Sequence, residues 1–493
     1  MTCFLGIDLG TSAAKVLVVD ERQAVRASAV VPLATSHPAP LASEQDCDSW
    51  WRAVADALDR IAAEAPDAMA EVAAIGLSGQ MHATVLLDAA DRPIRPAMLW
   101  NDGRAHAEAD ELKRLGPELA AELGVPALAG FTAPKLLWLA RHEPAAMART
   151  RALLLPKDLI RLHLTGERAT DPSDAAGTWL LDEARRAWSA RAIAAIGLDP
   201  ALLPRLVEGS APSGVVRPEI AARFGLRPGV VVAGGGGDTM VGGVGIGAVA
   251  DGRAFVGLST SAQLFVAADA HRPAPERMVH AFCHALPGRW CQMAALLNGA
   301  SVLASIAHLL GDADISAVLA EAEQGFSGRP ARLLVLPYLS GERTPHDDPY
   351  ARGVVFGLTA DTSRAELVQA ALEGVAFSLA DGRDALAAAG VHVDSAGVIG
   401  GGARSRFWTT LLASALNIPL RRFAGGERGP AFGAARLARL ALGADDVSTV
   451  LAEPPVTEIV APDPALTEAY QPRIEAFRRL YRALRPEFAE AAR

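Results

Sequence analysis

The first twenty residues consist of two apolar runs around a short polar turn. Residues 4–9 and 13–20 are mostly apolar, and they flank Gly10-Thr11-Ser12. Two short apolar runs joined by such a turn predict a β-hairpin. Asp8 lies within the first run, where a buried and unpaired carboxylate would cost several kcal/mol. A bound cation would relieve this cost, so we predict that Asp8 holds a metal ion.

The turn of this hairpin has the composition of a phosphate-binding loop. Gly10 lets a ligand approach the backbone closely, because it has no side chain. Thr11 and Ser12 offer hydroxyl and amide donors, and Lys15 adds positive charge nearby. We therefore predict that the turn contacts the phosphates of a nucleotide.

The same pattern occurs again after residue 250. The segment 253–269 repeats the arrangement of the first hairpin, with Gly257 in place of Asp8. Self-similarity across half of a chain indicates duplicated domains. We predict that only the first hairpin holds the metal, and that Ser259 and Thr260 close over the phosphates without adding negative charge. The matching pairs are Leu9 and Leu258, Thr11 and Thr260, Ser12 and Ser261, Ala13 and Ala262, and Asp20 and Asp269.

Two further apolar strands are predicted to run into glycine turns. Residues 230–233 precede four glycines and Asp238, and residues 397–399 precede Gly400, Gly401 and Gly402. We interpret these strands as a second repeated element, of which only the first copy ends in an acid. Each glycine costs about 0.5–1 kcal/mol relative to alanine in a regular element, so a purely structural role explains the four glycines poorly.

Several longer strings of the sequence resemble the FGGY family of carbohydrate kinases. Residues 130–138 resemble the first signature of the family, and residues 353–358 with 366–373 resemble the second. The likeness spans nearly the whole chain and is strongest to the xylulokinase branch. The strings that carry it are Gly79 to His82, Leu99 to Arg104, Leu155 to Asp158, Asp174 to Thr178, His280 to Pro287 and Leu339 to His346.

The resemblance implies a fold class and a division into domains. Members of this family have two α/β domains of the ribonuclease H-like fold, shared with actin-like ATPases, and a deep cleft between them. We expect residues 1–248 to form the N-terminal domain, with the sugar site, the catalytic base and the metal carboxylate. We expect residues 249–493 to form the C-terminal domain, with the nucleotide clamp and a last helix that packs back on the first domain.

The resemblance also implies roles for single residues. Phosphorylation of a sugar hydroxyl needs a group that takes the proton, and Asp238 is our candidate for this general base. The alternative is that Asp238 only caps the following helix. Asp8 is the candidate ligand of Mg²⁺, which takes few protein oxygens when phosphates are present. The expected sugar site contains Met81, His82, Trp100, Asn101, Asp238 and Thr239.

The nucleotide site is expected to combine both hairpins with the later glycine turn. The turns would contact the phosphates, and a turn without side chains leaves room for the adenosine. A small-residue helix beginning at Pro430 would pack against the nucleotide and link the domains. The expected nucleotide-binding residues are Gly10, Thr11, Ser12, Lys15, Ser259, Thr260, Gly400, Gly401, Gly402 and Ala403.

The implied reaction is transfer of the γ-phosphate of ATP, with Mg²⁺, to D-xylulose, giving D-xylulose 5-phosphate. One alternative is another ketopentose or polyol, such as ribulose, as the acceptor. A second alternative is an actin- or Hsp70-like ATPase built on the same fold. Ala83 and Thr239 stand where we expect glycine and asparagine in many relatives, so the preferred sugar stays open. Ser259 stands where we expect glycine, and its side chain would be strained if the second turn requires a positive φ there.

Composition and spacing narrow the classes of partner. The net charge of the 493 residues is −9 and no long Lys/Arg run occurs, which argues against nucleic acid. No P-loop motif occurs. His280 and His284 are four residues apart, but no nearby acid completes a zinc-binding pattern, so we do not expect a zinc site. The four cysteines form no CxxC pair, and no apolar run approaches the roughly 20 residues that span a bilayer. We therefore expect a cytoplasmic protein without a membrane partner, and a homodimer is one assembly that the sequence leaves open.

Overall fold

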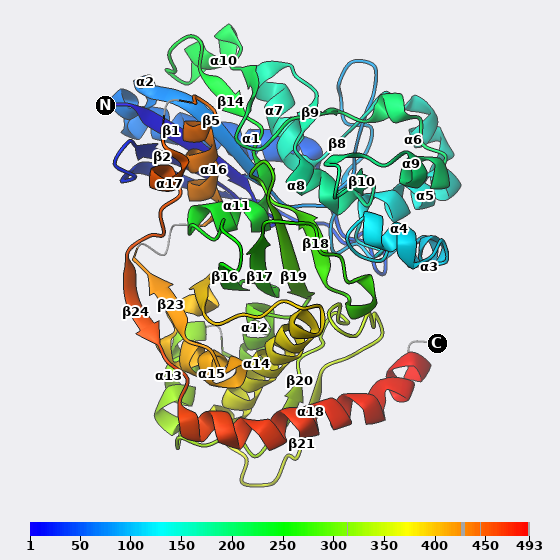
Figure 1. Cartoon of the computed structure of the whole chain (residues 1–493), viewed down its shortest axis with the longest axis vertical. Helices are drawn as coiled ribbons and strands as arrows, with labels where there is room; N and C mark the ends of the chain where they lie inside the picture. The colour runs from blue at the N-terminus through cyan, green and yellow to red at the C-terminus, as the bar shows by residue number, and fades with distance from the viewer. Residues whose placement is uncertain (313, 425–428, 444, 492–493) are drawn as a thin grey trace.

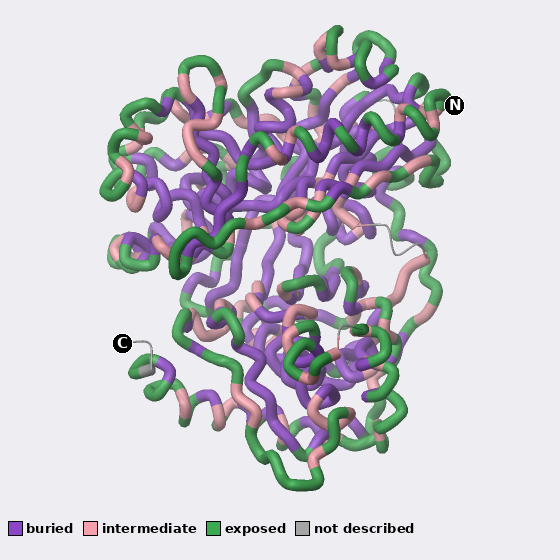
Figure 2. Tube along the Cα trace, turned by 180° about the vertical axis from the view of Figure 1, so that it is seen from behind, coloured by how far each residue is buried: buried purple, intermediate pink, exposed green. Residues whose placement is uncertain are grey.

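Two seven-stranded sheets, one from each half of the chain, form the frame of the molecule (Figure 1). The computed structural model describes residues 1–312, 314–424, 429–443 and 445–491. Helices cover both sheets, and the most deeply buried chain follows the strands of each half (Figure 2). The predicted α/β fold with two sheet-containing parts is confirmed.

The N-terminal sheet is built around the first hairpin. Strand β1 (Cys3–Leu9) pairs antiparallel with β2 (Ala13–Asp20), and Asp8 lies opposite Lys15. On its other side β1 pairs in parallel with β5 (Val72–Gly79). The hairpin is therefore formed as predicted, at the centre of its sheet. The other strands are β3 (Val25–Pro32), β13 (Pro212–Val215), β14 (Val231–Ala233) and β15 (Gly236–Gly237), in the order β13-β14-β5-β1-β2-β3 with β15 beside β5.

The C-terminal sheet repeats this centre. Strand β16 (Ala254–Leu258) pairs antiparallel with β17 (Ala262–Ala268) and in parallel with β22 (Ala396–Ile399). Gly257 lies opposite Gln263, as Asp8 lies opposite Lys15. The predicted duplication of the hairpin is confirmed. The remaining strands are β18 (His280–Cys283), β19 (Trp290–Leu296), β23 (Leu420–Phe423) and β24 (Val456–Val460), in the order β18-β19-β17-β16-β22-β23-β24.

The second repeated element predicted from the sequence is wrong. Strand β22 lies beside β16, so its counterpart is β5, which lies beside β1, and not β14. Both glycine turns nevertheless meet the same steric demand. A Cβ on Gly235 would lie 2.4 Å from the Leu77 carbonyl oxygen, and one on Gly400 would lie 2.5 Å from that of Leu258. The two glycine runs are alike because each turn crosses the end of a neighbouring strand.

Helix α16 (Pro430–Leu440) returns from the second half of the sequence to the first sheet, where it contacts β1, β5 and α11 (Asp238–Gly245). The contact is very close: a Cβ on Gly6 or Gly76 would lie 1.9 or 1.8 Å from a carbonyl oxygen of α16. The helix therefore links the two halves as predicted. A division of the chain at residue 248 therefore assigns α16 to the C-terminal domain, although the helix packs on the N-terminal sheet.

The last helix, α18 (Pro464–Ala491), does not follow its prediction. Its contacts lie on α14 (Arg364–Ala388), α15 (Arg406–Leu416) and β20 (Leu334–Leu336), all of the C-terminal half. Tyr470 donates to Glu373 at 3.1 Å, and Tyr481 donates to Asp348 at 2.7 Å. The helix runs along the C-terminal half (Figure 1). Its aromatic side chains belong to the buried core of that half.

The remaining elements surround these two sheets. Among the described residues, no helix is both long enough and apolar enough to cross a membrane. In the first half the helices are α1 (Cys47–Glu64), α2 (Pro66–Ala70), α3 (His106–Lys113), α4 (Pro117–Glu122), α5 (Thr132–His142), α6 (Pro144–Arg149), α7 (Pro156–Thr165), α8 (Pro172–Ala175), α9 (Ala190–Ala195) and α10 (Pro218–Arg223). In the second half they are α12 (Ala300–Leu309), α13 (Ile315–Gly325) and α17 (Val447–Val450). Short strands are β4 (Glu44–Gln45), β6 (Val85–Leu87), β7 (Ala97–Met98), β8 (Ala152–Leu154), β9 (Ala169–Thr170), β10 (Leu181–Asp182), β11 (Ala187–Trp188), β12 (Arg205–Leu206) and β21 (Val354–Phe356).

Candidate active site

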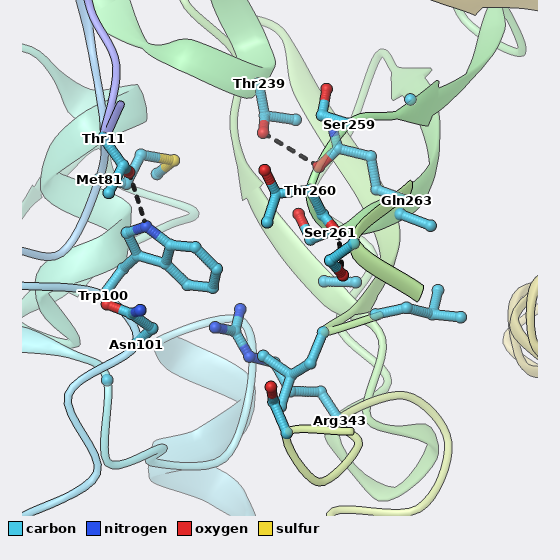
Figure 3. A pocket seen from close by; sticks show the side chains of 18 of the residues that line it. Thr11, Met81, Trp100, Asn101, Thr239, Ser259, Thr260, Ser261, Gln263 and Arg343 are labelled. Carbon is cyan, nitrogen blue, oxygen red and sulfur yellow. Dashed lines mark hydrogen bonds between the residues drawn. The ribbon is translucent and has the colours of Figure 1, made fainter. Parts of the chain in front are cut away.

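A cavity of about 2230 Å³ lies between the two halves, and residues of both hairpins line it. Figure 3 shows Thr11, Met81 and Trp100 on one side, with Thr239, Ser259 and Gln263 across from them. All of the site residues expected from the sequence line this cavity, with Gly402 as the exception. Gly402 is buried behind the wall, where a Cβ would lie 2.4 Å from the Leu258 side chain.

The two candidate acids lie in this one cavity. Asp8 is the last residue but one of β1 and accepts a hydrogen bond of 2.8 Å from the Ser78 hydroxyl. Asp238 begins α11 and accepts from the Thr239 amide at 2.7 Å. Burial raises the pKa of Asp8 to about 6. Burial and then the charge of Asp8 raise the pKa of Asp238 to about 7, so the two carboxylates interact.

The pair of acids fits a divalent cation bound through few protein ligands. In the part of the chain that the structure describes, no three His, Cys, Asp or Glu side chains gather as a metal site. Mg²⁺ does not need such a set, because it keeps several waters and is held by one or two carboxylates with substrate phosphates. Burial disfavours the charge of Asp8, and burial together with the charge of Asp8 disfavours that of Asp238. A cation held by Asp8 would offset both, and it would neutralise charge on a transferred phosphoryl group.

Two glutamines that the sequence analysis missed hold the first hairpin turn. Gln80 accepts from the Thr11 hydroxyl at 2.9 Å, and the Trp100 indole donates to the same hydroxyl at 3.0 Å. Gln45 donates to the Thr11 carbonyl at 2.6 Å and accepts from Gln80 at 2.9 Å. Two of the hydrogen bonds of the Thr11 hydroxyl are thus made inside the protein. Its main contribution to a phosphate would therefore come from the backbone.

His82 presents a defined acceptor to the cavity. Its Nδ1 lies 2.8 Å from the Gly177 carbonyl oxygen, which can only accept, so Nδ1 carries the proton. Burial, followed by the positive charge of Arg343, lowers the pKa of His82 well below its usual value. The ring is therefore neutral at pH 7, and Nε2 is free to accept a hydrogen bond from a hydroxyl. Thr132 and Lys135 of the first signature donate to the His82 carbonyl at 3.0 and 3.1 Å.

The second hairpin turn keeps ordinary backbone geometry. Ser259 is not among the non-glycine residues with positive φ, so the strain that its side chain would suffer there does not arise. Its amide donates to the Ser261 carbonyl, two residues on, at 3.0 Å, whereas the Gly10 amide donates to the Ala13 carbonyl, three residues on, at 3.0 Å. The first hairpin closes at the pair Leu9 and Ala14 and the second at Leu258 and Ala262, so the second turn is one residue shorter.

A buried charge cluster supports the turn that carries Asp238. The Lys157 ammonium group lies 2.7 Å from Asp158 and 3.0 Å from both Asp171 and Asp174, and all four side chains are fully buried. The Ser173 hydroxyl donates to Asp171 at 2.5 Å and accepts from the Gly237 amide at 3.2 Å. The cluster thus lies behind the backbone immediately before Asp238, which gives Lys157 and Asp158 a structural role.

Replacing Lys157 by methionine should destabilise the protein by about 3–5 kcal/mol, because three buried carboxylates lose their common cation. Chemical denaturation measures the effect. The matched control is Lys113→Met, which removes a half-exposed pair with Asp347 at 2.7 Å and should cost at most about 1 kcal/mol. Equal losses in the two variants would contradict the assignment of Lys157 as the cation that holds the cluster together.

Comparison with known proteins agrees with this geometry. The model of the FGGY family of carbohydrate kinases, N-terminal domain, matches residues 3–245, and that of the C-terminal domain matches residues 257–442. The xylulose kinase of Escherichia coli (strain K12) is 44% identical over 99% of this chain and 100% of that protein. The xylulose kinase of Klebsiella pneumoniae is 43% identical over 98% and 99%.

Solved structures give the same result. The crystal structure of a xyloylose kinase from Brucella ovis has a TM-score of 0.92 and 44% identity, covering 98% of this chain and 99% of that chain. The ligand-bound xylulose kinase from Lactobacillus acidophilus has a TM-score of 0.91 over 99% and 100%. Its identity is 23%, so this likeness speaks for the fold alone. The expected family is confirmed: the chain belongs to the FGGY family of carbohydrate kinases.

Proposed function

We propose that this chain transfers the γ-phosphate of ATP to D-xylulose and releases ADP and D-xylulose 5-phosphate. The observation that carries this proposal is the 44% identity to a xylulose kinase over 99% of the chain. The cavity supports it independently, since it combines two interacting acids, a neutral histidine and two phosphate-type turns. The actin- or Hsp70-like ATPase is not favoured.

The proposed roles follow from where each group lies. Asp238 takes the proton of the acceptor hydroxyl as the oxygen attacks the γ-phosphorus. Met81, His82, Trp100, Asn101 and Thr239 surround the sugar, and His82 accepts from one of its hydroxyls. Asp8 holds Mg²⁺. The nucleotide contacts the residues of the two turns and of the third glycine turn, which are Gly10, Thr11, Ser12, Lys15, Ser259, Thr260, Gly400, Gly401 and Ala403.

Gly402 has a different proposed role from its neighbours. It is buried against Leu258 and Trp408, so it allows the turn to pack and leaves contact with adenosine to the residues around it. Closure of the two halves over both substrates would exclude water, and this would suppress hydrolysis of ATP without sugar.

D-Xylulose should accelerate ADP formation strongly, with ADP and sugar phosphate released in equal amounts. The measurement couples ADP release to an optical assay and counts the phosphorylated sugar separately. A panel of D-xylulose, ribulose and pentitols tests the alternative acceptors. ADP formation that does not respond to any sugar would contradict the proposal and would return the ATPase alternative.

We also propose a location and an assembly for the protein. The four cysteines are free and buried, which suits a reducing compartment, and we propose the cytoplasm. We propose two domains of approximate extents 1–248 and 249–493. Helix α16 belongs to the second extent in sequence but packs on the sheet of the first. A homodimer is the proposed assembly, and sedimentation of the purified chain tests it.

A further inference from the structure

Arg343 lies on the cavity wall in the C-terminal half, within the string Leu339 to His346. Its guanidinium carbon is 5.5 Å from the centre of the Trp100 ring, which belongs to the other half (Figure 3). No hydrogen bond or ion pair joins this guanidinium to another residue in the described ranges. A guanidinium carries five N–H donors in a planar fork. Arg343 is partly exposed and lines the cavity, so these donors are available to a bound ligand.

The neighbouring acid is turned away from these donors. The Glu342 carboxylate accepts from the Leu297 amide at 2.6 Å, from the Asn298 amide group at 3.1 Å and from the backbone N–H of Arg343 at 2.8 Å. Glu342 and Arg343 are adjacent and oppositely charged, but they form no ion pair in the described part of the chain. Glu342 shapes the loop, and the guanidinium is left for the cavity.

The surroundings of Arg343 indicate which part of a substrate it faces. Its charge helps to lower the pKa of His82 and His280, whereas Asp238 is influenced mainly by burial and by Asp8. Arg343 thus belongs to the histidine end of the cavity, and the acids mark the end where the phosphoryl group is transferred. Under the proposed function, a sugar that reaches from the acids to this end of the cavity would present neutral oxygens, and not phosphates, to Arg343.

We propose that Arg343 binds the ketone end of the sugar through the oxygens on C1 and C2, while Asp238 receives the terminal hydroxyl at the opposite end. An α-hydroxyketone presents two adjacent oxygens, which two parallel N–H groups of a guanidinium fork can contact together. The Trp100 ring holds the plane of the fork through a cation–π contact. This inference rests on the proposed function, because it presupposes a ketopentose substrate.

The proposal makes the sugar a bridge between the halves. His82 and Trp100 come from the N-terminal half, and Arg343 comes from the C-terminal half. A sugar that contacts both sides stabilises the closed arrangement, in which the terminal hydroxyl and the γ-phosphate meet. A pentitol has a hydroxyl in place of the ketone and offers a different set of donors and acceptors to the fork, so Arg343 also favours ketoses over pentitols.

The test compares two sugars on two proteins. Wild type and Arg343→Met are assayed with D-xylulose and with 1-deoxy-D-xylulose, which lacks the C1 oxygen. Removing one partner of a hydrogen bond to a charged group costs roughly 10- to 100-fold, so wild type should lose this factor in kcat/KM with the deoxy sugar. Arg343→Met should lose a similar factor with D-xylulose and show little further loss with the deoxy sugar. The KM for ATP should stay within about twofold, and Arg343→Lys should fall between the two proteins.

Arg352→Met is the matched control. Arg352 lines the same cavity, but its guanidinium donates to the carbonyls of Pro349 and Ala351 at 2.9 and 2.8 Å. When D-xylulose is replaced by 1-deoxy-D-xylulose, this variant should lose the same factor in kcat/KM as wild type. The proposal would be overturned if Arg343→Met lost as much kcat/KM with the deoxy sugar as wild type does, or if its KM rose equally for sugar and ATP. Arg343 would then have only a packing role. A wild type inactive on D-xylulose would instead overturn the proposed function, and the ketone assignment with it.

Discussion

Replacing Asp238 with asparagine is expected to lower kcat for D-xylulose phosphorylation by about 10²- to 10⁴-fold, because an amide cannot take the proton of the attacking hydroxyl. Asparagine keeps the size of the side chain and can still accept from the Thr239 amide, so the start of α11 should survive. ATP should bind as in wild type, which calorimetry measures directly. Near-normal turnover would remove Asp238 from the role of base.

The pH dependence of wild type gives a second measure of the same residue. Burial and the charge of Asp8 raise the pKa of Asp238 to about 7, and a base must be deprotonated to act. The kcat/KM for the sugar should therefore decline as pH falls below about 7, after correction for inactivation. A flat profile between pH 5.5 and 8 would contradict this assignment.

Stability separates loss of the base from loss of the fold. Between its unfolded pKa of 3.8 and about 7, Asp238 keeps a proton in the folded protein that the unfolded chain has released. The stability contributed by the protonated form is thus complete below 3.8 and is lost as pH rises through about 7. Asp238→Asn avoids this loss, so the variant should melt at a higher temperature than wild type at pH 8, and the difference should be smaller at pH 5. A variant that melts lower at pH 8 is damaged in its fold, and its kinetics would not test the base.

Local patterns were sufficient to predict the hairpins and the position of the two acids. Each pattern of two apolar runs around a turn, near Asp8 and near Gly257, lies within about twenty residues. The pairing of each hairpin follows from its own turn. The prediction that β14 and β22 are equivalent strands was wrong. A glycine run indicates that two backbone segments approach closely, but it does not indicate which strand the turn crosses.

The features that the sequence did not predict depend on contacts between distant segments. Gln45 and Gln80 hold Thr11 through single hydrogen bonds, and isolated buried amides leave no periodic signal. The small residues of α16 are compatible with packing on either sheet, and only the glycines at 6 and 76 in the partner strands specify the first. Arg343 faces Trp100 only because the two halves come together, so its place could not be read from the composition of its loop.

Asp8→Asn is expected to lower kcat by about 10²- to 10³-fold and to weaken the response of the enzyme to Mg²⁺. A metal that stabilises charge on the transferred phosphoryl group contributes several kcal/mol, and each 1.36 kcal/mol corresponds to tenfold in rate. Nucleotide affinity measured without Mg²⁺ should change little, whereas the strengthening of binding that Mg²⁺ causes in wild type should largely disappear. Titration of Mg²⁺ at fixed ATP measures both effects.

Two further observations distinguish loss of a metal carboxylate from general damage to β1. Ser78→Ala removes the hydroxyl that donates to Asp8 at 2.8 Å but leaves the carboxylate, so it should cost less than about tenfold. The charge of Asp8 helps to raise the pKa of Asp238, so, measured without Mg²⁺, the titration profile of Asp238 in Asp8→Asn should lie at lower pH than in wild type. If the two variants lose activity equally and neither profile moves, Asp8 is a structural residue of the hairpin. If only Asp8→Asn loses its Mg²⁺ response and its profile shifts to lower pH, the two acids act on one reaction centre from the same cavity.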